Sequence, residues 1–195
     1  MRAREPDVTG SVVRDGVTLG FEVHGDEHAA STPAVLLLPT WTIIHTRFWK
    51  FQVPYLARHH RVVVYDGPGN GASDRVTDPV RYTPAAYAAD AAAVMDACEI
   101  RRAVAVGLSL GAGYALELAD LRPRSIAGLV LIGASLPLGP ALPQRTGIAD
   151  RFLDPAPDAP TGWDRYNLEY WHRHYGEFTE WFFAEALSEP HSTKA

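Results

Sequence analysis

Five residues, Gly107-Leu108-Ser109-Leu110-Gly111, form the pattern G-x-S-x-G. The apolar, β-branched run 103–106 before them is typical of a buried strand, and residues 112–119 after them are typical of a helix. A serine at the apex of a sharp strand-to-helix turn is a nucleophile elbow. A serine hydroxyl is a poor nucleophile near neutral pH, so it must be both exposed and activated. The pattern therefore predicts that Ser109 is a catalytic nucleophile.

The elbow also predicts which groups would stabilise the negative charge that forms when serine attacks a carbonyl. A helix that starts after Ser109 points its first N–H groups at the same spot, so the amide of Leu110 would be one donor. A second donor normally comes from the loop after an earlier central strand, here Pro39-Thr40-Trp41. By position, we expect Trp41 rather than Thr40 to supply this amide.

The elements that position these residues follow from the hydrophobic pattern. Residues 11–14 and 17–23 predict two short strands joined by the turn Asp15-Gly16. Continuous apolar runs predict buried strands, and helical patterns separate most of them. The predicted buried strands cover residues 34–38, 61–65, 104–108 and 128–133. The predicted helices cover residues 46–58, where the helix is broken or starts near Pro54, and residues 84–98 and 110–121. Because strands and helices alternate, the sequence predicts an α/β fold: a mostly parallel sheet with helices on both faces.

The alternation of predicted strands and helices ends after Ala134. The Pro-rich stretch that follows has no sustained periodicity, and residues 163–175 and 177–187 then predict two helices rich in aromatic residues. We therefore predict an α/β core in residues 1–135, followed in residues 136–195 by a linker and the start of a helical cap. The aromatic density favours either a layer over a pocket or a surface for a partner.

Three segments resemble the α/β-hydrolase fold family, in its epoxide-hydrolase-like and esterase-like branch. They are the strand and loop 36–41, the loop 66–74 (close to the family's D-x-R-G-x-G-x-S) and the elbow. The resemblance covers about residues 11–135 and is specific as to fold. Two departures are Pro39-Thr40 in place of the usual His-Gly and Pro68 in place of the usual Arg. Serine rather than aspartate at the nucleophile position disfavours epoxide hydrolysis and dehalogenation, and the resemblance implies hydrolysis of an ester-like or other acyl substrate through an acyl-enzyme.

The family carries its triad in the chain order Ser, Asp or Glu, then His. After the cap helices, no further strand and helix units are expected in this chain to present the acid and the histidine. His172 and His174 lie two residues apart on different faces of a helix, and His45 lies in the oxyanion-side loop. We therefore expect a C-terminally truncated form that lacks the triad Asp, the triad His and the last core strands.

Two other interpretations remain open. A non-catalytic hydrolase-like module that binds a small ligand, or a subunit completed by a partner chain, would explain the missing half of the triad. The run Gly67-x-Gly69-x-x-Ala72 after a strand mimics a dinucleotide-binding fingerprint. However, residues 73–82 predict a loop where that fingerprint needs a helix. No Gly-Lys-Ser/Thr follows, which excludes a P-loop.

The amino-acid composition indicates where the protein is located and which partners and cofactors it could have. The 195 residues are 47% hydrophobic and carry a net charge of -5 without a basic block, which argues against nucleic acid as a partner. No apolar segment predicts a signal peptide or a membrane span, so we expect a cytoplasmic protein. The single cysteine, Cys98, excludes an internal disulfide. No His/Cys cluster has metal-ligand spacing, and we expect neither a metal nor another cofactor.

The expected partners follow from the same features. The aromatic tail favours a small apolar or aromatic substrate. A sheet without its last strands would have an exposed edge, and an open apolar edge invites association. We therefore expect a homo-oligomer or a complementing chain rather than a monomer.

Overall fold

The computed structural model describes residues 4–29, 33–136, 139, 147–148 and 150–186. The chain forms two compact units, Met1–Leu136 and Pro137–Ala195. Parts of the predicted linker, the end of the last predicted helix at Leu187 and the histidine at 191 lie outside the described residues.

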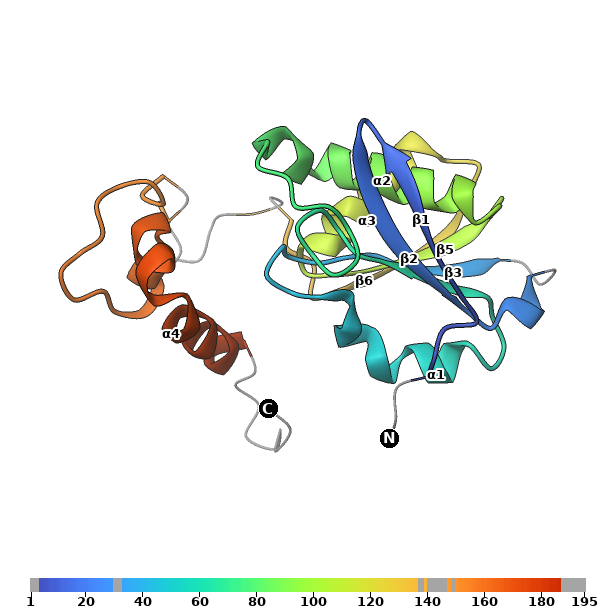
Figure 1. Ribbon diagram of the computed structural model, residues 1–195, viewed down its shortest axis with the longest axis horizontal. Coiled ribbons are helices and arrows are strands. Elements are labelled where there is room, and N and C mark those ends of the chain that lie inside the picture. The colour runs from blue at the N-terminus through green and yellow to red at the C-terminus, as the bar shows by residue number, and fades with distance from the viewer. Residues whose placement is uncertain (1–3, 30–32, 137–138, 140–146, 149, 187–195) are drawn as a thin grey trace. The chain divides into compact units, whose positions relative to one another are not determined.

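The first unit contains a six-stranded sheet, drawn in blue to yellow in Figure 1. Its strand order is β1-β2-β4-β3-β5-β6. β1 pairs antiparallel with β2, β2 pairs antiparallel with β4, and the other pairs are parallel. The strands are β1 (Val8–Arg14), β2 (Val17–His24), β3 (Ala34–Leu37), β4 (Val62–Tyr65), β5 (Ala103–Leu108) and β6 (Ile126–Ile132).

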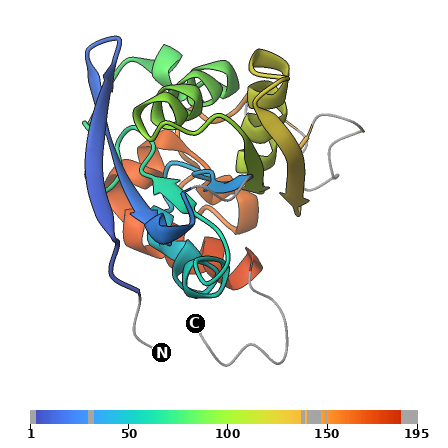
Figure 2. The ribbon, with the colours of Figure 1, turned by 90° about the vertical axis from the view of Figure 1, so that its right-hand side faces the viewer.

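Helices cover both faces of this sheet. The helices α2 (Pro84–Ala97) and α3 (Leu110–Leu121) pack on one face, over a core that includes the fully buried Leu36, Ala91 and Leu118 (Figure 2). The 3-10 helix η2 (Thr46–Phe51) and the short helix α1 (Val53–Leu56) pack on the other face against Leu37 and Val62. The predicted α/β class, with a mostly parallel sheet between two helical layers, is confirmed.

The sequence patterns explain these elements. β3 and β4 are buried at every residue, as expected of central parallel strands that consist only of apolar residues and one tyrosine. At the β1–β2 turn, Asp15 has φ 50° and Gly16 has φ 79°, the left-handed pair that a tight hairpin turn requires. The helix expected over 46–58, broken or started near Pro54, is the 3-10 helix η2 followed by α1, which starts at Val53 with Pro54 in its first turn, where a missing N–H costs nothing.

Two further 3-10 turns, η1 (Asp26–His28) and η3 (Pro79–Tyr82), lie in the connections of the first unit. The second unit contains η5 (Gly162–Arg165) and α4 (Leu168–Ala186). α4 is interrupted at His174, whose φ/ψ of −137°/39° is not helical, so the two predicted helices form one kinked element.

Most of the aromatic side chains of the second unit pack on one another. Phe178 is fully buried, and the rings of Trp171, Trp181 and Phe182 lie within 4.5–6.1 Å of its ring. Trp163 meets Trp181 edge to face at 5.2 Å. Ring pairs of this kind supply burial and specific geometry, so the aromatic density forms the core of this small unit.

Candidate active site

Ser109 lies between the end of β5 and the start of α3, with φ 55° and ψ −117°. A positive φ is rare for a residue with a side chain and is typical of strained functional turns. The backbone around it is held from three sides: Ser109 N–H donates to the carbonyl of Ile132 at 2.9 Å, and its own carbonyl accepts from Ala112 N–H at 3.1 Å and from Ser135 N–H at 3.2 Å. The turn is therefore fixed to β6 and its following loop as well as to α3.

The two glycines of the motif are required by close approach of backbone segments. A Cβ on Gly107 would collide with the carbonyl of Gly111, and a Cβ on Gly111 would collide with the carbonyl of Pro39. Gly107 therefore lets β5 and α3 meet at a sharp angle. Gly111 lets the loop after β3 lie directly against the first turn of α3.

The loop after β3 is tied to the elbow by Thr40. Its side chain is 1% exposed, and its hydroxyl donates to the carbonyl of Leu108 at 2.8 Å. The Trp49 indole N–H donates to the carbonyl of Leu38 at 3.1 Å and fixes the start of the same loop. Trp41, the next residue after Thr40, consequently follows a segment anchored beside Ser109. No local sequence pattern indicates this role of Thr40, because its partner is 68 residues away.

The Gly-rich loop after β4 is tied to its neighbours by its own polar groups. Asp66 accepts hydrogen bonds from the Thr46 hydroxyl and, at 3.0 Å, from the Ala72 N–H. The Ser73 hydroxyl donates to the Asp66 carbonyl at 2.6 Å and accepts from Gly20 N–H at 2.9 Å. No helix begins between residues 66 and 78, so the helix N-terminus that a dinucleotide fingerprint needs is missing.

Most histidines of the first unit lie near the amino ends of the parallel strands, whereas Ser109 lies at their carboxyl ends. Ser109 follows the carboxyl end of β5, whereas His59 and His60 precede β4 and His28 precedes β3. His24 pairs in register with Val62, the first residue of β4, and therefore also lies at the amino ends of the parallel strands. These four histidines are not positioned to take a proton from Ser109.

His45 lies beyond the carboxyl end of β3, on the same side of the sheet as Ser109, but both of its ring nitrogens face other groups. Nδ1 accepts a hydrogen bond from Arg47 N–H at 3.0 Å, so the proton of the neutral ring is on Nε2. Nε2 lies 3.7 Å from the Asp66 carboxylate. In this arrangement the ring has no free acceptor for a serine proton. Among the described residues of the first unit, none is therefore placed as the base of a triad.

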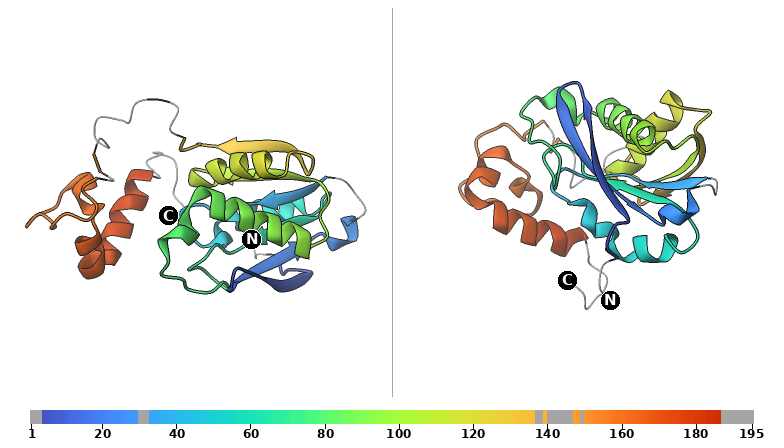
Figure 3. Two further views of the ribbon diagram at one scale, coloured as in Figure 1. Left: turned by 90° about the horizontal axis from the view of Figure 1, so that it is seen from above. Right: turned by 45° about the vertical axis from the view of Figure 1, so that its right-hand side comes forward.

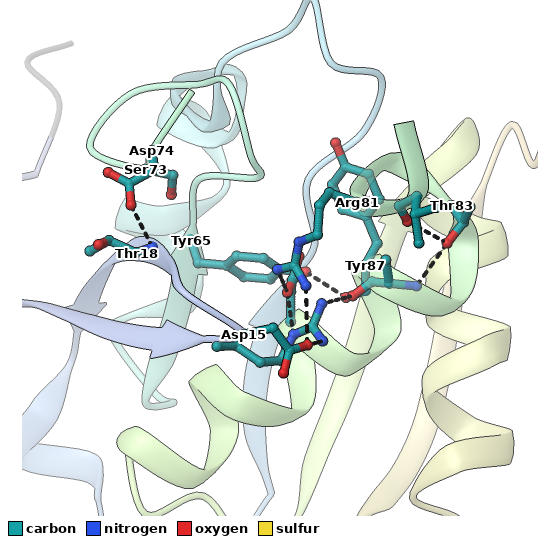
Figure 4. A network of polar contacts seen from close by, with 12 residues as sticks. Asp15, Thr18, Tyr65, Ser73, Asp74, Arg81, Thr83 and Tyr87 are labelled. Carbon is teal, nitrogen blue, oxygen red and sulfur yellow. Dashed lines mark hydrogen bonds and ion pairs between the residues drawn. The ribbon is translucent and has the colours of Figure 1, made fainter. Parts of the chain in front are cut away.

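A second polar cluster joins β1, η3 and α2. Asp90 is fully buried, and one of its oxygens accepts from Arg14 at 2.5 Å and from Arg81 at 3.0 Å. Arg81 also pairs with Asp15 at 3.3 Å (Figure 4). Burial raises the pKa of the Asp90 carboxyl, and the hydrogen bonds and charges of the two arginines oppose this shift. The cluster fastens the β1–β2 hairpin to α2.

Burial also raises the pKa of side chains in the core of the first unit. It raises the pKa of the Cys98 thiol to about 11, and that of Tyr114, which stacks on Tyr87 at 4.2 Å, to about 12.

Within the described parts of the chain, no three His, Cys, Asp or Glu side chains are grouped so that they could hold a metal ion. No described helix is both long enough and apolar enough to span a membrane.

A mostly parallel sheet between helical layers, with a strand–serine–helix turn at its carboxyl edge, is the architecture of the α/β hydrolases. The family model for the alpha/beta hydrolase fold matches residues 33–185. The chain belongs to this family, as its sequence motifs predicted.

Individual relatives are hydrolases that are longer than this chain. A 2-hydroxymuconate semialdehyde hydrolase of Pseudomonas sp. (strain CF600) is 39% identical over 87 residues, which are 45% of this chain and 30% of the relative. A putative carbamate hydrolase RutD of Azorhizobium caulinodans is 33% identical over 58% of this chain and 40% of the relative. The chain thus spans less than half the length of these curated relatives.

The same likeness holds among solved structures. The crystal structure of a hydrolase from Pseudomonas aeruginosa PA01 has a TM-score of 0.60 and 35% sequence identity, and it matches 75% of this chain and 53% of its own. An epoxide hydrolase from Vigna radiata, VrEH1, has a TM-score of 0.59 at 25% identity over 74% of this chain. The fold is therefore shared with hydrolases of several kinds.

Proposed function

We propose that this chain carries the nucleophile half of a serine hydrolase site, with Ser109 as the nucleophile. The observation that carries the proposal is the backbone of Ser109, a non-glycine residue at φ 55° between β5 and α3. A strained turn of this kind lifts the serine oxygen out of the sheet. Serine Oγ would attack the substrate carbonyl, pass its proton to a base, and release the leaving group with that proton. Water would then hydrolyse the acyl-enzyme.

Backbone amides would stabilise the tetrahedral intermediate. Leu110 is the first residue of α3, where N–H groups have no partner within the helix, so its amide would be one donor. Trp41 would supply the second, because the anchored Thr40 and the contact of Pro39 with Gly111 hold its loop against the elbow. Two such donors bind developing negative charge more strongly than a neutral carbonyl.

The base and the acid of this site would come from outside the first unit. None of the histidines at 24, 28, 45, 59 and 60 is placed to serve Ser109, and the family order puts acid and base after the nucleophile. The chain covers 30–40% of the length of the hydrolases that it resembles, and we propose that residues outside the first unit complete this site. Without a base, catalysis would be limited to what binding and the oxyanion donors supply, about 10³–10⁴-fold over water in other serine hydrolases.

The proposed substrate is a small apolar or aromatic molecule with an ester-like or other acyl group. The relatives named as carbamate and semialdehyde hydrolases act on carbonyl-containing small molecules by their names, which supports an acyl substrate. Within the second unit, a cavity of about 150 Å³ is lined by Trp163 and Tyr166 together with the charged Arg151, Asp154 and Asp164, so it could take a molecule with both an aromatic and a polar part. We propose that this unit is part of a cap.

A fluorophosphonate probe tests the nucleophile, since it phosphonylates activated serines covalently. We expect slow labelling at Ser109, detected by intact mass and by peptide mapping. Imidazole in the buffer should accelerate labelling, because a diffusible base can stand where the triad histidine is missing. Ser109→Ala should abolish the label.

The matched control is Ser135→Ala. Ser135 is an exposed serine whose backbone N–H, rather than its side chain, bonds to the elbow, so labelling should persist in this variant. A folded chain that stays unlabelled at Ser109 with imidazole present would contradict the proposal and favour a non-catalytic module. Fast labelling that imidazole does not change would instead place a base within this chain.

A further inference from the structure

The loop after β4 holds Asn70 in a defined position on the Ser109 side of the sheet. β3 and β4 are parallel neighbours, so the loops that follow them leave the sheet on the same side, where the left view of Figure 3 shows the green connection after β4. Asn70 lies between Gly69 at φ 86° and Gly71 at φ 48°. Its N–H donates to the carbonyl of Gly67 at 3.1 Å, and its carbonyl accepts from Ser73 N–H at 2.9 Å. The backbone of its own loop therefore fixes Asn70.

The side chain of Asn70 joins this loop to the loop after β3. Its Nδ2 donates a hydrogen bond to the backbone carbonyl of Thr42 at 2.8 Å. A carbonyl oxygen can only accept, so the amide nitrogen of Asn70, rather than its oxygen, must face Thr42. Only a side chain that donates a hydrogen bond can make this link.

The bond to Thr42 fixes the chain directly after Trp41. Thr40, on the other side of Trp41, is anchored to the end of β5 by its hydroxyl. Ile44 N–H donates to the carbonyl of Trp41 at 2.9 Å, which closes a tight turn over residues 41–44. Thr40 therefore holds the start of the turn, and Asn70 holds its second residue.

We propose that Asn70 is a positioning residue for the oxyanion donor. This inference rests on the proposed function, in which the amide of Trp41 is one of the two donors. Asn70 would act through Thr42 and Trp41 rather than on the substrate itself. A donor stabilises the transition state only when it lies within hydrogen-bond distance of the developing charge, and a displacement of about 1 Å can cost about a hundredfold in rate.

The test is the rate of fluorophosphonate labelling at Ser109 with imidazole present, measured over a range of probe concentrations. We expect Asn70→Ala to lower the maximal labelling rate about ten- to a hundredfold, because the donor acts on the transition state. The probe concentration that gives half of this rate should change less than about twofold, since binding of the unreacted probe does not depend on the donor. A role of Asn70 in stability alone would leave both values of the folded protein unchanged.

Two further variants sharpen this test. Asn70→Asp keeps the shape of the side chain, but a carboxylate cannot donate to the Thr42 carbonyl, so the loss in rate should be at least as large as in Asn70→Ala. Asn70→Asp also replaces Asn70→Ala if circular dichroism shows that the latter does not fold. The matched control is Arg75→Ala, at an exposed position just after the same loop, and it should label like the wild type.

Amide hydrogen exchange, followed by NMR, tests the link between the loops without any chemistry at Ser109. In Asn70→Ala, the Ile44 amide should exchange at least about tenfold faster, while the amides of β3 keep their rates. Unchanged exchange at Ile44 would overturn the proposal, and so would a normal labelling rate in Asn70→Ala and Asn70→Asp. If the wild type is not labelled at all, the proposed function fails, and exchange at Ile44 still decides whether Asn70 positions the turn.

Discussion

Strands β1 and β6 both lie at an edge of the sheet, yet β1 includes Thr9, Ser11 and Arg14 whereas β6 has no polar side chain. Figure 2 shows the β1–β2 hairpin and β6 on opposite sides of the sheet. β1 joins the sheet by antiparallel pairing, and Arg14 at its end is held by the buried Asp90. β6 joins by parallel pairing to β5 and exposes its last three residues.

The two edge strands therefore differ in composition and in what they contact. Polar side chains and a charged end are common ways of ending a sheet in water, and β1 has both. β6 instead supports the elbow, since the carbonyl of Ile132 accepts the N–H of Ser109. The nucleophile turn therefore depends on a backbone contact with β6.

The largest expected effect comes from removing the charge that fastens the β1 edge. Asp90→Ala would leave the guanidinium groups of Arg14 and Arg81 without their buried partner. We expect a loss of up to about 3–5 kcal/mol in the free energy of unfolding, because only the exposed Asp15 would remain to pair with the two guanidinium groups. Urea unfolding followed by circular dichroism measures this loss. A loss below about 1 kcal/mol would mean that the hairpin is held by backbone pairing alone.

A smaller effect is expected from a pair of glycine substitutions on adjacent strands. Gly107→Ala in β5 would force its methyl group into the carbonyl of Gly111, whereas Gly128→Ala in β6 would meet nothing closer than 4.0 Å. We expect Gly107→Ala to cost about 1–3 kcal/mol, as overpacking does, and to slow labelling of Ser109. Gly128→Ala should be neutral or stabilise by up to about 1 kcal/mol.

Chemical unfolding of both variants checks this prediction, with probe labelling as the functional measurement. Equal losses in the two variants would show that the edge strand is packed as tightly as the interior strand. That result would remove the contrast between β6 and its neighbour.

The strands were predictable because apolar, β-branched runs need burial wherever they occur. The hairpin turn was predictable because Asp15-Gly16 favours left-handed backbone angles. Some ends of these elements differ from the prediction by up to three residues, since the last residues of a strand depend on its neighbours. The interruption of α4 at His174 could be anticipated only as a boundary between two helices.

The site was predictable only where one segment contains the whole pattern. The elbow is such a segment, and its two glycines are explained by local contacts. The bond from Thr40 to Leu108 and the Asp90 cluster join residues that are 68 and 76 positions apart, and no local pattern reports them. The orientation of His45 likewise depends on Arg47 N–H and on Asp66, which the spacing of histidines in the sequence does not indicate.

The smallest effect is expected for the ion pair between α2 and the segment that precedes β6. Asp96 lies on α2, six positions after Asp90, and pairs with Arg122 at 2.7 Å, with side chains 60% and 40% exposed. Water and salt screen such a pair, so Asp96→Ala should cost no more than about 1 kcal/mol. The difference from the wild type should disappear in about 1 M salt, where the screening length is about 3 Å. Urea unfolding at low and high salt measures both values. A loss comparable to that of Asp90→Ala would show that charge, rather than apolar contact, holds both edges.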